Sequence, residues 1–181
     1  MKEALLIIDV QNDYFENGKM ELKNPLKALE NIKRLLAKFR NEKKEIIFIK
    51  HIAIREEAGF FLKDTYGSEI HEAIMPLASE KIVLKNYPNS FFNTELDEYL
   101  KEKNIENLVI TGMMTHMCVD STTRAARDLG YKCVVIKDTC ATRDFIFEGN
   151  IVTAEDIQSS FMTALGYYYA EILSCAEYLK N

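Results

Sequence analysis

Apolar residues along the chain fall into short continuous runs, separated by longer segments with helical periodicity. Runs of strand length lie at residues 4–9, 45–50, 81–84, 107–111, 132–137 and 168–173. Helical patterns cover residues 25–41, 94–103, 116–129 and 153–165. Continuous apolar strands are typical of sheets that are buried on both faces. The alternation predicts an α/β fold with a doubly wound, mainly parallel six-stranded sheet and helices on both faces.

Several helix ends carry recognisable boundary residues. Thr94 and Thr153 are predicted N-caps, because each is followed three residues later by an aspartate. Gly130 and Gly166 are predicted to end the helices that precede them. The sequence shows no repeat and no linker, so we expect a single domain over residues 1–181.

The segment 52–80 departs from this alternation, because it is long and only weakly periodic. It contains Phe60, Phe61 and Tyr66. A loop of this length in a compact domain is usually functional. We therefore expect it to form part of a pocket wall or of a subunit contact.

Composition and charge narrow the class of partner. The 181 residues are 48% hydrophobic, with a formal net charge of -5 and a sequence pI near 5.3. This acidity argues against nucleic acid or an anionic membrane as the main partner. The four cysteines have no paired spacing, and the first apolar run is too short to span a bilayer. We expect a cytoplasmic protein that acts on a small molecule.

Three chemically reactive side chains follow predicted strands. Asp9 ends the first strand, Lys85 follows the third, and Cys118 comes just after the fourth. Ligands of doubly wound sheets bind beyond the carboxyl ends of the strands, where the strand order reverses. In the common order 3-2-1-4-5-6, the first and fourth strands are neighbours, which brings Asp9 beside Cys118 with Lys85 in reach.

These side chains have complementary chemistry. A thiol at a helix N-terminus is favoured as thiolate, and the backbone N–H groups there can bind an oxyanion. Asp9 is the candidate base for the Cys118 proton, and the Lys85 ammonium would hold both anions. We expect the pKa of Cys118 to lie below that of a free thiol.

The surrounding motifs resemble the isochorismatase-like cysteine hydrolases. The resemblance rests on LLIIDVQND at residues 5–13, KNYPNSFF at residues 85–92 and the segment 112–131. It implies a catalytic triad of Asp9, Lys85 and Cys118. It also implies a cis peptide between Met113 and Met114, with the N–H groups of Met114 and Cys118 forming an oxyanion hole.

Two departures from relatives in that family narrow the expected reaction. Nicotinamidases have an Asp-x-His pair after the second strand and further histidines that bind a metal. Here that segment carries only His51, with His71 nearby, so we expect no metal and no other cofactor. Members that cleave the vinyl ether of isochorismate can work without the cysteine. Retention of Cys118 favours hydrolysis of a C–N bond through a thioester.

Alternatives from other classes stay open. The protein is either an amidohydrolase of small amides, ureides or carbamoyl compounds, or a vinyl-ether hydrolase in which Asp9 is the acid. A third interpretation is a redox sensor or scaffold that uses the Cys118 thiol, with Cys140 as a resolving cysteine.

Aromatic side chains supply the candidate substrate contacts. Those we single out are Phe15, Tyr87, Phe91 and His116, and further candidates for the pocket wall are Phe60, Phe61 and Phe145. Their plainer role is packing, and His51 and His116 are equally well explained as packed or capping side chains. Similar proteins are oligomers, so we expect a homodimer or homotetramer, with the tyrosine-rich segment 167–169 as one possible contact.

Overall fold

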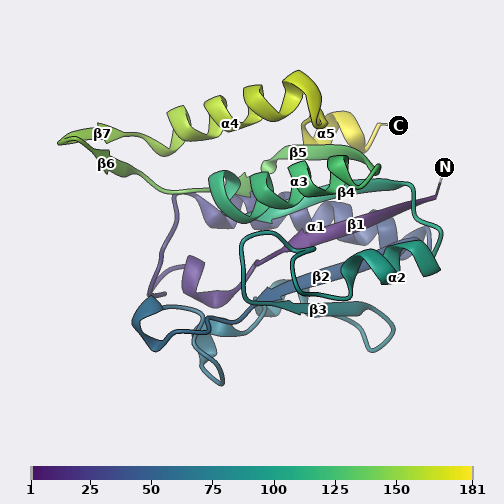
Figure 1. Cartoon of the computed structure of the whole chain (residues 1–181), viewed down its shortest axis with the longest axis horizontal. Helices are drawn as coiled ribbons and strands as arrows, with labels where there is room; N and C mark the ends of the chain where they lie inside the picture. Colours follow the sequence, from purple (N-terminus) through teal and green to yellow (C-terminus); the bar gives the residue numbers. More distant parts are fainter. Residues whose placement is uncertain (1, 181) are drawn as a thin grey trace.

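The computed structural model describes residues 2–180, and its centre is a six-stranded parallel sheet in the order β3-β2-β1-β4-β5-β8 (Figure 1). The strands are β1 (Glu3–Ile8), β2 (Glu45–His51), β3 (Lys81–Lys85), β4 (Asn107–Met113), β5 (Lys132–Ala141) and β8 (Glu171–Leu173). The predicted fold class and strand order are confirmed. The last strand is numbered β8 only because two short strands precede it in the chain.

Helices cover both faces of the sheet, which explains the continuous apolar runs. The helices are α1 (Pro25–Asn41), α2 (Leu96–Glu102), α3 (Asp120–Asp128), α4 (Ala154–Tyr168) and α5 (Cys175–Tyr178). Leu5 and Ile7 of β1 join the cluster that contains α1 and α5, whereas Leu6 and Ile8 join the cluster that contains α2, α3 and α4. Burying each such side chain stabilises the fold by about 1.5–3 kcal/mol.

Some predicted boundaries are confirmed and others are wrong. Thr153 caps α4 by accepting a hydrogen bond from the N–H of Asp156, and Gly130 follows α3 with a φ of 98°. Thr94 is not the N-cap of α2, since that helix begins at Leu96; its hydroxyl instead donates to the carbonyl of Ser90 at 2.6 Å.

The C-terminal region also differs from the prediction. Gly166 does not end α4, which continues to Tyr168, so the last strand contains only Glu171–Leu173. A Cβ at Gly166 would lie 3.1 Å from Cγ1 of Ile172. The glycine therefore allows close packing of α4 on β8, at the modest cost that glycine has inside a helix.

A two-stranded hairpin that was not predicted leaves the carboxyl end of β5 and leads to α4. Its strands, β6 (Phe145–Phe147) and β7 (Asn150–Val152), are antiparallel and project from the body (Figure 1). Glu148 and Gly149 join them, with φ values of 50° and 81°. Two consecutive positive φ values are typical of the tight turn that matches strand twist.

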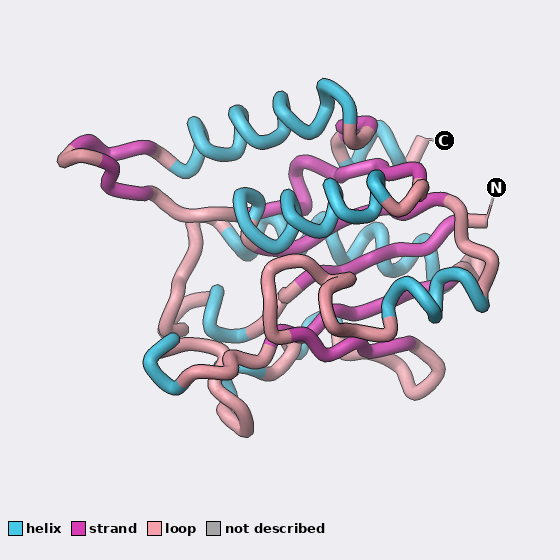
Figure 2. The backbone as a smooth tube through the Cα atoms, viewed as in Figure 1, coloured by secondary structure: helices cyan, strands magenta, loops and turns pink. Residues whose placement is uncertain are grey.

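The segment 52–80 runs mostly as loop (Figure 2) and contains the short 3-10 turns η2 (Glu56–Ala58), η3 (Tyr66–Ser68) and η4 (Glu72–Ile74). It packs against η1 (Asn12–Tyr14), the turn that follows β1. Within residues 2–180, no helix is both long enough and apolar enough to cross a membrane.

Candidate active site

The carboxyl ends of β1, β3 and β4 bring the three predicted reactive side chains together. Asp9 follows β1, Lys85 is the last residue of β3, and Cys118 lies in the π-helical turn η5 (Thr115–Val119) after β4. Asp9 Oδ2 lies 2.7 Å from Lys85 Nζ, and the Cys118 thiol interacts with both groups. This contact across three strands follows from the parallel register, which places all three strand ends at one edge.

Asp9 is held in an unusual backbone conformation. Its φ of 51° lies in the left-handed region, which aspartate enters more easily than most residues do. Its N–H donates to the carbonyl of Ile49 at 3.0 Å, and its carbonyl accepts from Gln11 N–H at 3.0 Å. The chain therefore turns sharply where β1 ends, and such local strain is common at functional sites.

Gly112 allows β1 and β4 to approach closely beside this turn. It pairs with Ile8, and a Cβ on Gly112 would lie 2.0 Å from the Ile8 carbonyl oxygen. Its φ of 121° also favours glycine. Immediately afterwards, the Met113-Met114 peptide bond is cis, and Val119 N–H donates to the Met114 carbonyl across the π-turn.

Burial dominates the electrostatics of the cluster. Asp9 and Lys85 are 0% and 1% exposed, and Cys118 is 5% exposed. Burial and then the Asp9 carboxylate raise the pKa of the Cys118 thiol, while Lys85 lowers it only in part. The expectation of a depressed thiol pKa is therefore wrong for the resting protein, because the helix-end effect was considered without the loss of water.

The two charged partners respond differently to their surroundings. Burial alone would lower the pKa of Lys85, but the Asp9 carboxylate and Cys118 outweigh it and raise that pKa, so the ammonium stays charged. Asp9 Oδ1 has no hydrogen-bond partner among the residues that the structure describes. The Cys118 thiol, which interacts with this carboxylate, is the donor available to it.

His51 also belongs to this cluster, which the sequence reasoning did not establish. Asp9, His51 and Cys118 each place a potential metal-ligand atom within 4.8 Å of the others. The Lys85 ammonium already contacts all three, with Nζ 3.1 Å from His51 Nδ1. The cation that these three side chains contact is therefore the ammonium group of Lys85. His71 is elsewhere, with its ring 4.3 Å from that of Phe15.

Tyr14 is a further residue beside the cluster that sequence reasoning missed. It is buried, and its ring centroid lies 4.7 Å from that of Phe61. Burial, followed by the charges of Cys118 and Asp9, raises the pKa of Tyr14. The sequence feature that could have pointed to Tyr14 is its position directly after the motif at residues 5–13. The neighbouring Phe15, which we had singled out instead, stacks on His71.

The other predicted substrate contacts are dispersed. Tyr87 is half exposed with its ring 4.8 Å from that of Phe92, and only its carbonyl joins the cluster, by accepting from Lys85 Nζ at 3.1 Å. Phe91 faces Tyr131, which precedes β5 at the amino edge of the sheet.

His116 lies in the same π-turn as Cys118 and faces the hairpin. Its Nδ1 is 2.8 Å from Thr142 Oγ1, and its ring makes an edge contact with Phe145 at 4.6 Å. Burial and then Arg143 lower the pKa of His116. It is the predicted substrate contact that lies nearest to Cys118 in the chain.

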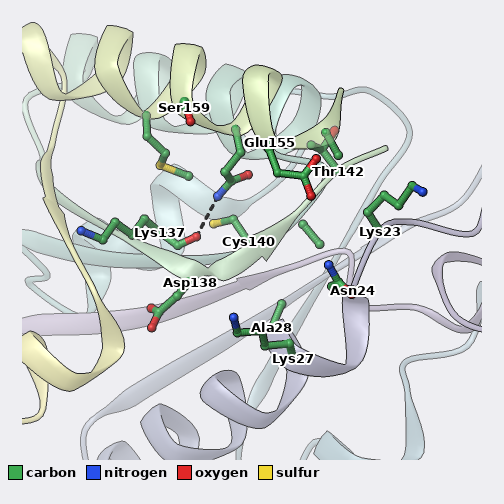
Figure 3. A pocket seen from close by; sticks show the side chains of 14 residues that line it. Lys23, Asn24, Lys27, Ala28, Lys137, Asp138, Cys140, Thr142, Glu155 and Ser159 are labelled. Carbon is green, nitrogen blue, oxygen red and sulfur yellow. Dashed lines mark hydrogen bonds between the residues drawn. The ribbon is translucent and has the colours of Figure 1, made fainter. Parts of the chain in front are cut away.

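A cavity of about 440 Å³ is lined by residues from the start of α1, the end of β5 and α4 (Figure 3). Its wall includes Lys23, Lys137, Cys140 and Thr142, but not Asp9, Lys85 or Cys118. Gln158, also in the wall, donates to the Lys137 carbonyl at 2.8 Å. The cavity therefore does not open onto the three reactive side chains, which are buried.

Comparisons with known proteins agree with this geometry. The isochorismatase domain model matches residues 3–173. The isochorismatase family protein YddQ of Bacillus subtilis is 47% identical over 99% of this chain and 100% of its own. The solved structure of an isochorismatase-hydrolase relative from Oleispira antarctica superposes with a TM-score of 0.95 at 42% identity, covering 99% and 97% of the two chains. Ureidoacrylate amidohydrolase RutB of Cronobacter sakazakii is 28% identical over 76% of this chain and 73% of its own.

Proposed function

Because the chain belongs to the isochorismatase family of hydrolases, we propose that it cleaves a C–N bond in a small amide, ureide or carbamoyl compound through a cysteine thioester. The observation that carries this proposal is the buried contact among Asp9, Lys85 and Cys118. The RutB relative, an amidohydrolase by name, supports the choice of a C–N bond.

Asp9 is the group that moves the proton in this proposal. Its free Oδ1 accepts the proton of the Cys118 thiol as the thiolate attacks the substrate carbonyl. The carbonyl oxygen becomes an oxyanion, which the N–H groups of Met114 and Cys118 stabilise as an oxyanion hole. Lys85 keeps its charge throughout and compensates whichever neighbour is negative.

The second half of the reaction reverses these roles. Asp9 returns its proton to the leaving nitrogen as the C–N bond breaks, which leaves an acyl thioester on Cys118. Water then attacks the thioester carbonyl, Asp9 accepts a proton from that water, and the C–S bond breaks. The proton passes back to the thiolate, so the products are a carboxylic or carbamic acid and an amine or ammonia.

The raised thiol pKa is compatible with this sequence. Burial and the neighbouring Asp9 carboxylate both favour the neutral thiol of Cys118 at rest. The thiolate therefore forms when substrate displaces the remaining water, and it need not exist beforehand.

We place substrate recognition at His116 and Tyr14 and propose a homodimer or homotetramer in the cytoplasm. His116 lies in η5 with Cys118, and Tyr14 in η1 interacts with Cys118 and Asp9. Support for self-association is the exposure of Tyr167 and Tyr168 at the end of α4, since exposed aromatic side chains are enriched in protein interfaces.

The test is a screen of small amides, ureides and carbamoyl compounds for ammonia or amine release, with Cys118→Ser and Cys133→Ser as a matched pair. Cys133 is also buried, and its thiol hydrogen-bonds to the carbonyls of Thr123 and Tyr131, away from Asp9 and Lys85. We expect Cys118→Ser to reduce turnover by at least about a thousandfold and Cys133→Ser to leave it unchanged.

Intact-mass measurement during turnover, with a chelator present, completes this test. An acyl adduct on Cys118 supports the thioester route, and activity that persists in the chelator supports a metal-free site. Wild-type turnover by a folded Cys118→Ser variant would disprove the assignment of the nucleophile.

A further inference from the structure

His51 is fixed beside Lys85 by both strand pairing and a side-chain clamp. It ends β2 and pairs with Lys85 in the parallel register of β2 and β3. Gln11 Nε2 donates to the His51 carbonyl at 2.8 Å, and Gln11 Oε1 accepts from the His51 N–H at 2.8 Å. The same Gln11 amide donates to the Ser68 carbonyl at 2.8 Å. The imidazole therefore projects from a backbone with little freedom.

The hydrogen bond between Lys85 and His51 determines which ring nitrogen of His51 carries the hydrogen. An ammonium has only donors, so His51 Nδ1, which lies 3.1 Å from Lys85 Nζ, must accept the hydrogen bond. Nδ1 then carries no proton, and the neutral ring has its hydrogen on Nε2. Asp9 Oδ2 lies 2.7 Å from the same ammonium, so the cation is held from two sides.

We propose that His51 is a positioning residue whose neutral imidazole accepts a hydrogen bond from Lys85 and holds the ammonium against Asp9 and Cys118. Its effect on turnover rests on the proposed function, whereas its effect on the Cys118 thiol does not. Lys85 Nζ already donates to the carbonyls of Tyr87 and Pro88, at 3.1 and 3.4 Å. Without the His51 acceptor, we expect the ammonium to shift toward these two carbonyls and away from the thiol.

The proposal makes the site sensitive to acid. Protonated His51 has a hydrogen on Nδ1, so a donor faces a donor and two positive charges meet. The groups that face the ring are Asp9 from β1, Lys85 from β3, Cys118 from η5 and the apolar ring of Phe61. Burial lowers the pKa of His51, Asp9 opposes this, and Lys85 lowers it further. The contact should therefore persist at neutral pH and fail only below pH 6.5.

The first experiment compares His51→Asn with His51→Gln. The Asn amide oxygen takes the place of Nδ1, whereas the longer Gln places its amide near the position of Nε2. The readout is the rate of iodoacetamide labelling of the Cys118 peptide against pH, measured by mass spectrometry on the full chain. We expect Gln to slow labelling about tenfold at neutral pH, and Asn to stay within about threefold of wild type.

His71→Asn is the matched control, because its Nδ1 accepts only from the Ala73 N–H outside the cluster. It should leave Cys118 labelling unchanged. Equal labelling in the Asn and Gln variants, with both folded, would overturn the proposal. Failure of Cys118→Ser to abolish turnover would refute the proposed reaction without changing these labelling rates.

A second measurement needs no variant at the site. The chain has three histidines, so ¹⁵N spectra of the imidazoles can be assigned with single substitutions. We expect His51 to show the Nε2–H tautomer, with a titration midpoint below 6.5. An Nδ1–H tautomer, or a ring that is charged at neutral pH, would show that His51 does not accept from Lys85.

Discussion

The segment 52–80 and the β6-β7 hairpin extend from the same end of the sheet but are held in opposite ways (Figure 1). The first is anchored along its length, and its Phe61 is only 1% exposed. In the hairpin, Ile146, Phe147 and Ile151 are 79%, 67% and 71% exposed. The segment 52–80 thus has buried anchor points such as Phe61, although its Tyr66 is 79% exposed, whereas the three hairpin side chains are all mostly exposed.

The anchoring comes from polar side chains that directly follow Asp9. Gln11 donates to the Ser68 carbonyl and Asn12 to the Tyr66 carbonyl, at 2.8 and 2.9 Å. Asp13 accepts from the N–H groups of Phe61 and Lys19, at 2.6 and 3.1 Å. Asp9 therefore contacts Lys85 and Cys118, while the three polar residues at positions 11–13 hold the segment 52–80. Among the described residues, no side chain outside the hairpin hydrogen-bonds to its two strands, which pair with each other in an antiparallel ladder and contact the body through Phe145 and His116.

Replacing one phenylalanine in each region by alanine is expected to give the largest difference in the free energy of unfolding between the two regions. Phe61→Ala leaves a cavity against Tyr14 and His51 and should lower the free energy of unfolding by about 3–5 kcal/mol. Phe147→Ala removes an exposed ring and should change it by less than about 0.5 kcal/mol. Urea unfolding of both variants measures the difference.

The same pair tests whether the loop covers the site. Phe61→Ala should also speed alkylation of Cys118 in the folded protein, because the ring packs on His51 beside the thiol. Phe147→Ala is the control and should leave alkylation unchanged. Similar losses of stability in both variants would show that the hairpin is packed in solution, and the contrast drawn here would be wrong.

Replacing the aspartate at the base of each region by asparagine is expected to change stability by an intermediate amount. Asp13→Asn places an amide donor against one of the two N–H groups that Asp13 now accepts from, at a cost of about 1–3 kcal/mol. Asp144→Asn keeps an oxygen for the N–H of Ala154 near solvent, so its effect should be smaller. Thermal unfolding compares the two. A larger loss for Asp144→Asn would mean that the hairpin base, and not the loop, carries the stability of this edge.

The fold and the contact among Asp9, Lys85 and Cys118 could be predicted because both depend on strand ends. Apolar runs locate the strands, and parallel strands of known order bring their carboxyl ends together. The burial of Cys118 could not be predicted in this way. It depends on how the turn η5 packs against Leu6 and Ile8 on the face of the sheet that α2, α3 and α4 cover, and the positions of the strand ends do not specify that packing.

The contacts of single aromatic and histidine side chains were harder still to predict from the sequence. Tyr14 and Phe15 are adjacent, yet one packs against Phe61 near Cys118 and the other against His71. The direction of each ring is set by the 3-10 turn η1, which no sequence pattern indicated. His51 looked like an isolated histidine because its partner Lys85 lies 34 positions away. The hairpin did have a signal, since Glu148 and Gly149 sit between two apolar runs.

The smallest effect should come from the cross-strand pair of the hairpin. Ile146 and Ile151 lie opposite each other, and both side chains are mostly exposed. Replacing both by threonine keeps β-branched side chains that suit strands and removes apolar area that is already in water. We expect a change of less than about 0.5 kcal/mol in unfolding free energy, equal at low and high protein concentration.

Unfolding and sedimentation of this double variant are measured together over a dilution series. A loss of stability that grows with dilution would mean that a second copy covers the hairpin, because only an associated state gives stability that depends on concentration. In that case the contrast with the segment 52–80 would hold within one chain and disappear in the oligomer.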